Sequence, residues 1–287
     1  MPAARSSTPR SAARTRRIQT SHRTLALLVG RVEQGDSNLV LTLFTQTLGK
    51  VSALARNARN SKRRFAGSLE PMHTLSVELD DSGGDLMTLR ESTLTTPRHH
   101  LIADLASMQC AGLALRWVRH AAPPRTVEPT LWRLLETLLT ALDRPQNRLD
   151  PQVLLAEFGL QLLPALGWGL QLEQCVRCSR PCPANKKAYV SPQHGGLLCR
   201  NCGMARLVLS PELRARMIRA TANPGAGQFA DQNGDNDPDN NNPDNNDPDT
   251  RHPDNRAQET ALLAEDCDSV LSLIEQCLAT HANFSDS

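Results

Sequence analysis

Apolar and polar residues alternate over the first third of the chain and then adopt a helical period. Five alternating runs predict β-strands, at about Leu25–Val32, Leu39–Phe44, Val51–Ala55, Met72–Asp80 and Leu86–Thr95. Turn-forming residues separate the runs, and the longest connection joins the third strand to the fourth. This plan predicts a five-stranded OB-fold barrel, a fold that commonly binds oligonucleotides, and leaves an SH3-like barrel open as an alternative.

From residue 99 onward the apolar positions recur with the period of helices. Three stripes over residues 101–118, 131–142 and 153–163 predict core helices, in which Trp117 and Trp132 are expected to be packed. Ser210-Pro211 predicts the start of a basic helix that runs to about Ala220. Its three arginines are expected to face solvent: Arg214, Arg216 and Arg219. A last helix is predicted over about Glu259–Thr280.

Four cysteines stand in two pairs, Cys175-x-x-Cys178 and Cys199-x-x-Cys202. A two-residue spacer lets both thiolates of a pair reach one ion, and the stretch from Ser179 to Leu198 has the length found in zinc ribbons. The sequence therefore predicts one zinc ion held by all four cysteines. With four thiolate ligands the ion has no open position, so its expected role is structural.

Other uses of these cysteines are less well supported. A dithiol redox centre needs one pair on a βαβ unit, and disulfides need an export signal, and neither is present. The zinc deaminases need a His-x-Glu motif upstream and a proline before the second pair, where this chain has Leu198. Cys182 lies between Pro181 and Pro183 and is not assigned as a ligand. Cysteine pairs in a chain without an export signal favour a reducing cytoplasm.

Charge is strongly segregated although the net charge is only +2. Residues 1–66 hold 13 Lys and Arg against 2 acidic residues, and residues 175–222 hold 9 against 1. Residues 223–287 hold 2 against 14. Two basic regions in one chain predict a polyanionic partner.

Basic residues concentrate at two places in the first 66 residues. The connection after the third predicted strand carries five cations and no acid, namely Arg56, Arg59, Lys62, Arg63 and Arg64. Such a loop beside a barrel predicts phosphate contacts, against the alternative of a solvated loop. Phe65 can either stack on a base or anchor the loop to the core. Lys50 and four arginines nearer the N-terminus complete the predicted DNA-binding set: Arg14, Arg16, Arg17 and Arg23.

These features divide the chain into five parts. They are a basic flexible arm (1–24), an OB-fold domain (25–98), a helical domain (99–174), a zinc-binding element (175–205) and a helical C-terminal part (206–287). The arm also resembles a mitochondrial transit peptide. Residues 223–256 are rich in Asn and Asp and predict a disordered insertion, in preference to a calcium loop. No apolar run is long enough to predict a membrane span.

The order of these parts and several local strings resemble the RecO family of bacterial recombination mediators. The strings are Gly35–Val40, Leu43-Phe44-Thr45, Leu48-Gly49-Lys50, Ala55–Arg59 with Ser61 and Arg64-Phe65, Leu69-Glu70-Pro71, Leu86–Glu91, Phe158–Gly167 and Gly195–Cys199. The resemblance covers about residues 25–213. It departs from the family in the arginine-rich arm, in the Asn/Asp-rich insertion and in Asn57, where glycine is commoner.

The resemblance implies a multidomain α+β protein with an N-terminal OB-fold, an α-helical C-terminal domain and an inserted zinc element. It further implies binding of single- and double-stranded DNA, annealing of complementary strands and, with RecR, loading of RecA onto DNA covered by single-strand binding protein. No cluster of catalytic residues or small-molecule site is expected. The alternatives are a zinc-ribbon transcription or ribosome factor and a zinc hydrolase or nuclease. The expected location is the bacterial cytoplasm, at the nucleoid.

Overall fold

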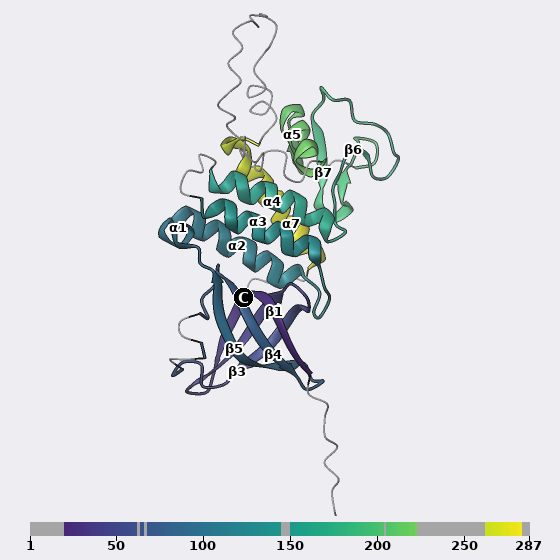
Figure 1. Ribbon diagram of the computed structural model, residues 1–287. Helices are drawn as coiled ribbons and strands as arrows, with labels where there is room; N and C mark the ends of the chain where they lie inside the picture. The colour runs from purple at the N-terminus through teal and green to yellow at the C-terminus, as the bar shows by residue number, and fades with distance from the viewer. Residues whose placement is uncertain are drawn as a thin grey trace, which may run out of the picture.

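The computed structural model describes residues 20–61, 64–65, 68–144, 150–203, 205–222 and 262–282. Its N-terminal part is a closed barrel of five strands: β1 (Thr20–Gln34), β2 (Asn38–Thr45), β3 (Gly49–Ala55), β4 (Thr74–Asp81) and β5 (Leu86–Thr96). The order around the barrel is β1-β2-β3-β5-β4, with β4 paired to β1 and β3 parallel to β5 (Figure 1). This arrangement is that of an OB-fold, so the sequence prediction is confirmed and the SH3-like alternative is set aside.

The first strand is longer than the alternation predicted. It spans Thr20–Gln34 and not only the central apolar run. Residues 20–23 pair through their backbones with β4, while the side chains of Thr20, Ser21 and Arg23 stay exposed. Backbone pairing needs no apolar side chain, so no pattern marked these residues. Residues 20–24 were assigned to the flexible arm and instead form the start of the barrel.

The barrel has its own apolar core, to which Leu41, Leu43 and Leu79 contribute fully buried side chains. Phe65 projects into this core from the connection between β3 and β4 and is only 2% exposed. The ring therefore anchors the basic loop to the barrel, and the alternative in which Phe65 stacks on a base is wrong.

A helical bundle lies against one end of the barrel (Figure 1). Its members are α1 (His99–Ala103), α2 (Leu105–Ala121), α3 (Pro129–Leu142), α4 (Pro151–Ala165), α5 (Pro211–Ala222) and α7 (Cys267–His281). Helix α4 is central and packs against α2, α3, α5 and α7. Trp117 of α2 is fully buried and stacks on Phe158 of α4, with ring centroids 6.4 Å apart. Gly159 leaves room for Ile274, which a Cβ would meet at 2.5 Å.

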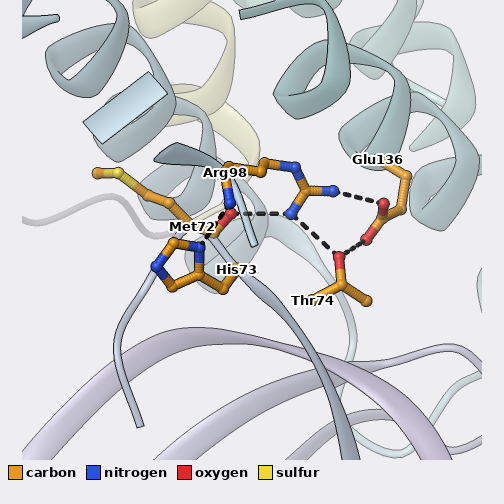
Figure 2. A network of polar contacts seen from close by, with 5 residues as sticks. All are labelled: Met72, His73, Thr74, Arg98 and Glu136. Carbon is orange, nitrogen blue, oxygen red and sulfur yellow. Dashed lines mark hydrogen bonds and ion pairs between the residues drawn. The ribbon is translucent and has the colours of Figure 1, made fainter. Parts of the chain in front are cut away.

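The barrel and the bundle share a packed interface. Phe44 of β2 meets Trp132 of α3 with ring centroids 6.0 Å apart. Beside this pair, buried Arg98 extends from the connection after β5 to the carboxylate of Glu136 on α3, at 2.6 Å (Figure 2). The same guanidinium donates to the carbonyl of Met72 and to the hydroxyl of Thr74, both next to or within β4. This network fixes the barrel to the bundle.

The C-terminal helix is shorter than its periodicity predicted. Helix α7 begins at Cys267, after a short 3-10 turn over Ala264–Asp266. The carboxylate of Asp266 accepts the backbone N–H of Leu263 at 3.1 Å and receives Arg216 of α5 at 2.8 Å, and this favours a turn before the helix. Leu262 is buried although it is not helical. Residues 259–261 lie outside the described residues.

A small four-stranded sheet lies on the side of the bundle that is away from the barrel (Figure 1). Its strands are β6 (Gln171–Cys175), β7 (Ala188–Ser191), β8 (Gly196–Leu197) and β9 (Leu207–Leu209), in the order β6-β8-β7-β9. Leu172, Val190 and Leu209 of this sheet join the apolar core of the bundle. Strand β9 lies in the segment predicted as purely helical, and its three residues are too few to show a period. Among the described residues, no helix has the length and apolar content of a membrane span.

A candidate metal centre and a candidate nucleic-acid interface

Each cysteine pair forms a tight turn at the end of a strand. Cys175 ends β6, and its carbonyl accepts the backbone N–H of Ser179 at 2.9 Å, which bends the chain so that Cys178 faces back. Cys199 follows β8, and its carbonyl accepts the backbone N–H of Cys202 at 3.0 Å. Because β6 and β8 are neighbouring parallel strands, the two turns meet at one edge of the sheet.

The four sulfur atoms form a compact cluster. All four lie within 4.8 Å of one another, and Cys178 Sγ and Cys199 Sγ are 3.7 Å apart. Sulfur atoms in a tetrahedron with Zn–S bonds of about 2.3 Å are separated by about 3.8 Å. Disulfide-bonded sulfurs would be only about 2.05 Å apart. The arrangement therefore fits a four-thiolate metal centre, and the predicted ligand set is brought together.

The electrostatics of the cluster favour a cation at its middle. The backbone N–H of Cys199 donates to Cys175 Sγ at 3.4 Å and lowers the pKa of that thiol to about 6. Hydrogen bonds with the Cys199 and Cys178 sulfurs raise the pKa of Cys202 to about 12. A hydrogen bond from Cys202 lowers the pKa of Cys199 as well, so the thiolates of Cys175 and Cys199 form readily, while a metal ion would be needed to deprotonate Cys202.

Cys182 is kept apart from this cluster by its own contacts. It is not part of the four-sulfur group, its backbone N–H donates to Glu173, and the guanidinium of Arg214 contacts its sulfur. Arg214 is only 4% exposed and also donates to the carbonyl of Pro183 at 2.7 Å. The prediction that Arg214 faces solvent is wrong, because its guanidinium packs under the loop that contains Cys182 and Pro183. Arg216 pairs with Asp266, and only Arg219 of the three is exposed.

The basic loop after β3 is only partly described. Residues 62 and 63, and with them Lys62 and Arg63, lie outside the described residues, as do Arg14, Arg16 and Arg17. Arg56 is exposed, and its carbonyl accepts the guanidinium of Arg64 at 2.8 Å. Arg64 in turn lies over the ring of Phe65 at 5.2 Å. The loop thus folds back on itself around a buried anchor.

Carboxylates that are distant in sequence lie close to two of these arginines. Arg59 pairs with Glu33 of β1 at 3.2 Å. Arg64 borders a shallow hollow that it shares with Glu78, Asp80, Arg90 and Glu91 of β4 and β5. The loop contains no acid, but its folded surroundings have mixed charge. Neither Arg56 nor Arg64 has an ion-pair partner among the described residues, but Arg64 borders the hollow with its carboxylates and Arg56 does not.

Arg23 lies near the hollow that Arg64 borders, whereas Lys50 lies where the barrel meets the bundle. Arg23 is exposed on β1 and 3.6 Å from Glu78. Lys50 is half-buried and donates to the carbonyl of Arg119 at the C-terminal end of α2, at 2.7 Å. Burial, followed by the charge of Arg119, lowers the pKa of Lys50. Among the described members of the predicted DNA-binding set, Lys50 is thus held at the interface between barrel and bundle, while Arg23 and Arg64 both lie near Glu78.

Comparison with known proteins covers both parts of this structure. The family model "Recombination protein O N terminal" matches residues 20–98, which form the barrel and the connection to α1. The model "Recombination protein O C terminal" matches residues 102–224, which include the bundle through α5 and the cysteine cluster. The chain belongs to the RecO family.

Named relatives of this RecO protein agree with that assignment. It is similar to "DNA repair protein RecO" of Geobacter metallireducens, with 33% identity over 218 residues, 74% of this chain and 86% of the relative. The protein of the same name in Geobacter sulfurreducens is 35% identical over 208 residues, 71% of this chain and 81% of the relative. The "DNA repair protein RecO" of Anaeromyxobacter sp. strain K is 38% identical over 172 residues, which are 60% of this chain and 66% of the relative. A role in DNA repair and recombination follows.

Three features of this RecO structure explain or extend the sequence pattern. Asn57 has a φ of 55°, a left-handed conformation that Asn and Gly adopt with least strain, so either residue is suited to this position. Sequence reasoning missed the basic residues of α2 near Lys50, namely Arg116, Arg119 and His120, and burial and the neighbouring cations lower the pKa of His120. The spacing of these three residues places them on one helix face and would have identified them. The C-terminal helix α7 lies beyond the matched residues and still packs on α4.

Proposed function

We propose that this protein is a sequence-independent DNA-binding recombination mediator that anneals complementary strands. Membership of the RecO family and the OB-fold barrel support this function, because that fold commonly offers a face and loops to oligonucleotides. The observation that carries it is exposed Arg56, which starts a loop with five cations and has no ion-pair partner among the described residues. Both single- and double-stranded DNA present phosphates to such a loop.

The mechanism relies on charge more than on base stacking. Aromatic residues make up 3% of the chain, and the ring nearest the loop, Phe65, is buried. Contacts to phosphates position a strand without reading its sequence and leave the bases free to pair. Two strands held in this way can anneal. Arg14, Arg16, Arg17, Arg23, Lys50, Arg59, Lys62, Arg63 and Arg64 are proposed to extend the contact.

Zinc is the proposed ion for the four-cysteine centre. Cys175, Cys178, Cys199 and Cys202 would hold it and close the two turns onto each other. Four thiolates leave no position for water or substrate, so we assign no catalytic residue and infer that the protein is not an enzyme. The match to the family over the barrel and bundle favours this function over a zinc-ribbon transcription or ribosome factor.

The protein partners are proposed from the family. They are RecR, with which RecA would be loaded, and the single-strand binding protein that covers the DNA. The named relatives come from bacteria, and this supports a place in the bacterial cytoplasm at the nucleoid. Neither a membrane nor a small-molecule substrate is part of the proposal.

Removal of the loop cations tests this function. We expect the variant Arg56→Ala/Arg59→Ala/Lys62→Ala/Arg63→Ala/Arg64→Ala to bind unrelated DNA sequences more weakly and to anneal strands more slowly. Each lost phosphate contact should reduce the log–log salt slope on single strands by about 0.7. Among single variants, Arg56→Ala should have a larger effect than Arg59→Ala, because Glu33 already neutralises Arg59. Glu33→Gln should therefore tighten binding.

A control that removes charge elsewhere makes the result specific. The variant Arg133→Ala/Arg144→Ala removes two exposed cations of the helical part and should leave the salt slope closer to that of the wild type. If the five-fold loop variant folds normally and keeps the wild-type slope and annealing rate, the loop is not the DNA-binding surface.

A further inference from the structure

A cavity lies beside the metal centre, on the far side of the bundle from the barrel. Its volume is about 510 Å³, and its apolar wall includes Pro181, Pro183 and Leu197. Cys175 and Cys199 border one side of it, whereas Cys178 and Cys202 do not. The cavity is thus adjacent to the four-sulfur cluster and shares two of its cysteines. Its volume is within the range of sites that enclose one small organic ligand, about 300 to 1,000 Å³.

Four cations line this cavity: Arg180, Lys186, Lys187 and Arg200. No carboxylate lines it, and none of the four has an ion-pair partner among the described residues. On the barrel, by contrast, Arg59 and Arg23 both lie beside a glutamate. A divalent ion with four thiolates carries about two negative charges, fewer than the four cations, so the site keeps a positive potential.

Strand pairing holds the backbone of the tyrosine that lines the cavity. Tyr189, the only tyrosine of the chain, is half-buried on β7 and lines the cavity. It pairs with Val208 of β9, and its carbonyl accepts the backbone N–H of Leu198 at 2.9 Å. The part of the wall at Pro183 is fixed by Arg214, which is buried and donates to the carbonyl of Pro183. The cavity is therefore preformed.

We propose that this cavity binds one unstacked nucleotide of single-stranded nucleic acid. The base lies against the ring of Tyr189 and the apolar wall, and the flanking phosphates contact the surrounding cations. An aromatic surface bordered by cations is the combination that single-strand binders use. The inference rests on the proposed function and adds to it a second DNA contact, separated from the barrel loop by the bundle.

Variants of the full-length, zinc-loaded protein test this site with a fluorescently labelled single-stranded oligonucleotide. Tyr189→Leu keeps apolar bulk and removes the ring, so it should weaken binding about five-fold or more. Tyr189→Phe keeps the ring and should bind as the wild type does. With an oligonucleotide of the same length made of abasic sites, Tyr189→Leu and the wild type should bind equally, because that probe has no base to stack.

Charge is tested separately. Lys186→Gln/Lys187→Gln should reduce the single-strand salt slope by about 1.4, which corresponds to two contacts of about 0.7 each. The charge-matched control Arg133→Gln/Arg144→Gln, on the helical part, should change it less. Zinc content and circular dichroism equal to the wild type in every variant show that the module is folded.

The outcomes separate this inference from the proposed function. A wild-type protein without affinity for single strands overturns both. If the wild type binds and Tyr189→Leu and Lys186→Gln/Lys187→Gln bind equally well, the cavity is not a nucleotide site, while the proposed function stands. In a third outcome, Lys186→Gln/Lys187→Gln weakens binding, Tyr189→Leu has the same effect on the normal and the abasic oligonucleotide, and a polyglutamate peptide competes with both. The cavity is then a site for acidic peptides, and the inference is overturned.

Discussion

Arg98 and Glu136, which are 38 residues apart in sequence, form an ion pair of 2.6 Å between the barrel and the bundle. The guanidinium is 1% exposed, and its Nε has no partner among the described residues. Burial lowers the pKa of Arg98, and the charge of Glu136 opposes this effect. The contact between barrel and bundle thus includes the buried charge of Arg98, which is stabilised by its pairing with Glu136.

Neutralising Glu136 should therefore destabilise the protein. We expect Glu136→Gln to lower the free energy of unfolding by about 3 kcal/mol, because it leaves a buried guanidinium without its counter-charge. Urea unfolding at neutral pH measures this. The matched control is Glu275→Gln, which breaks the exposed pair with Arg116 at 3.3 Å and should cost less than about 1 kcal/mol. Equal losses in the two variants would contradict this account.

The sequence pattern predicted the features that depend on residues close together in the chain. Alternation located all five barrel strands, and the Cys-x-x-Cys spacing located the four-sulfur cluster, because each depends on residues that are close in sequence. The pattern did not reveal Thr20 to Arg23 as strand, since their pairing with β4 uses only the backbone.

Relationships between distant residues could not be read from the chain. Arg214 has the same local context as an exposed helix arginine, yet the loop containing Pro183 folds over it. Glu33 neutralises Arg59 only because β1 and the basic loop meet in the folded barrel. Counting Lys and Arg along the sequence therefore overestimates the positive charge of the surface near β3. The same counts do not reveal the cavity beside the metal centre.

Metal content is the direct test of the cysteine cluster. Freshly purified, reduced protein should contain one zinc per chain, with Zn–S distances of about 2.3 Å by X-ray absorption. Cys199→Ser should lose the metal and unfold the β6–β9 sheet, because the ligand bonds contribute the folding energy of such modules. Cys182→Ser should retain the zinc, since its sulfur is outside the cluster. Zinc-free protein that is fully folded would exclude a structural zinc site.

The Asn/Asp-rich insertion should be dispensable for folding. Residues 223–256 contain eight Asp and two Arg and almost no large apolar residues, so they have little apolar surface to bury. Deleting them should leave the thermal midpoint nearly unchanged. It should also tighten DNA binding at low salt, because net negative charge is removed. Replacing the segment by a neutral Gly/Ser linker of equal length controls for chain length. A large loss of stability in both variants would show that the segment packs against the rest of the protein.

Acid should destabilise the protein through His73 at the interface between barrel and bundle. The ring of His73 is 9% exposed, and its Nδ1 accepts the backbone N–H of Arg98 at 3.0 Å. Burial first, then the charges of Arg98 and His99, lower the pKa of His73 below its ordinary value of 6.5, against smaller opposing effects of Glu70 and Asp143.

The sign of the effect follows from linkage. Below about pH 6.5 the unfolded chain binds a proton at His73 more readily than the folded protein does, so stability is lost as the pH falls towards the lowered pKa. His73→Asn, whose side-chain oxygen can accept the same N–H, should reduce the difference in unfolding free energy between about pH 7.5 and about pH 5. The pKa of His120 is also lowered, chiefly by burial, so adding His120→Asn should reduce the difference further. An unchanged pH dependence in the double variant, measured by urea unfolding, would rule out both histidines as its source.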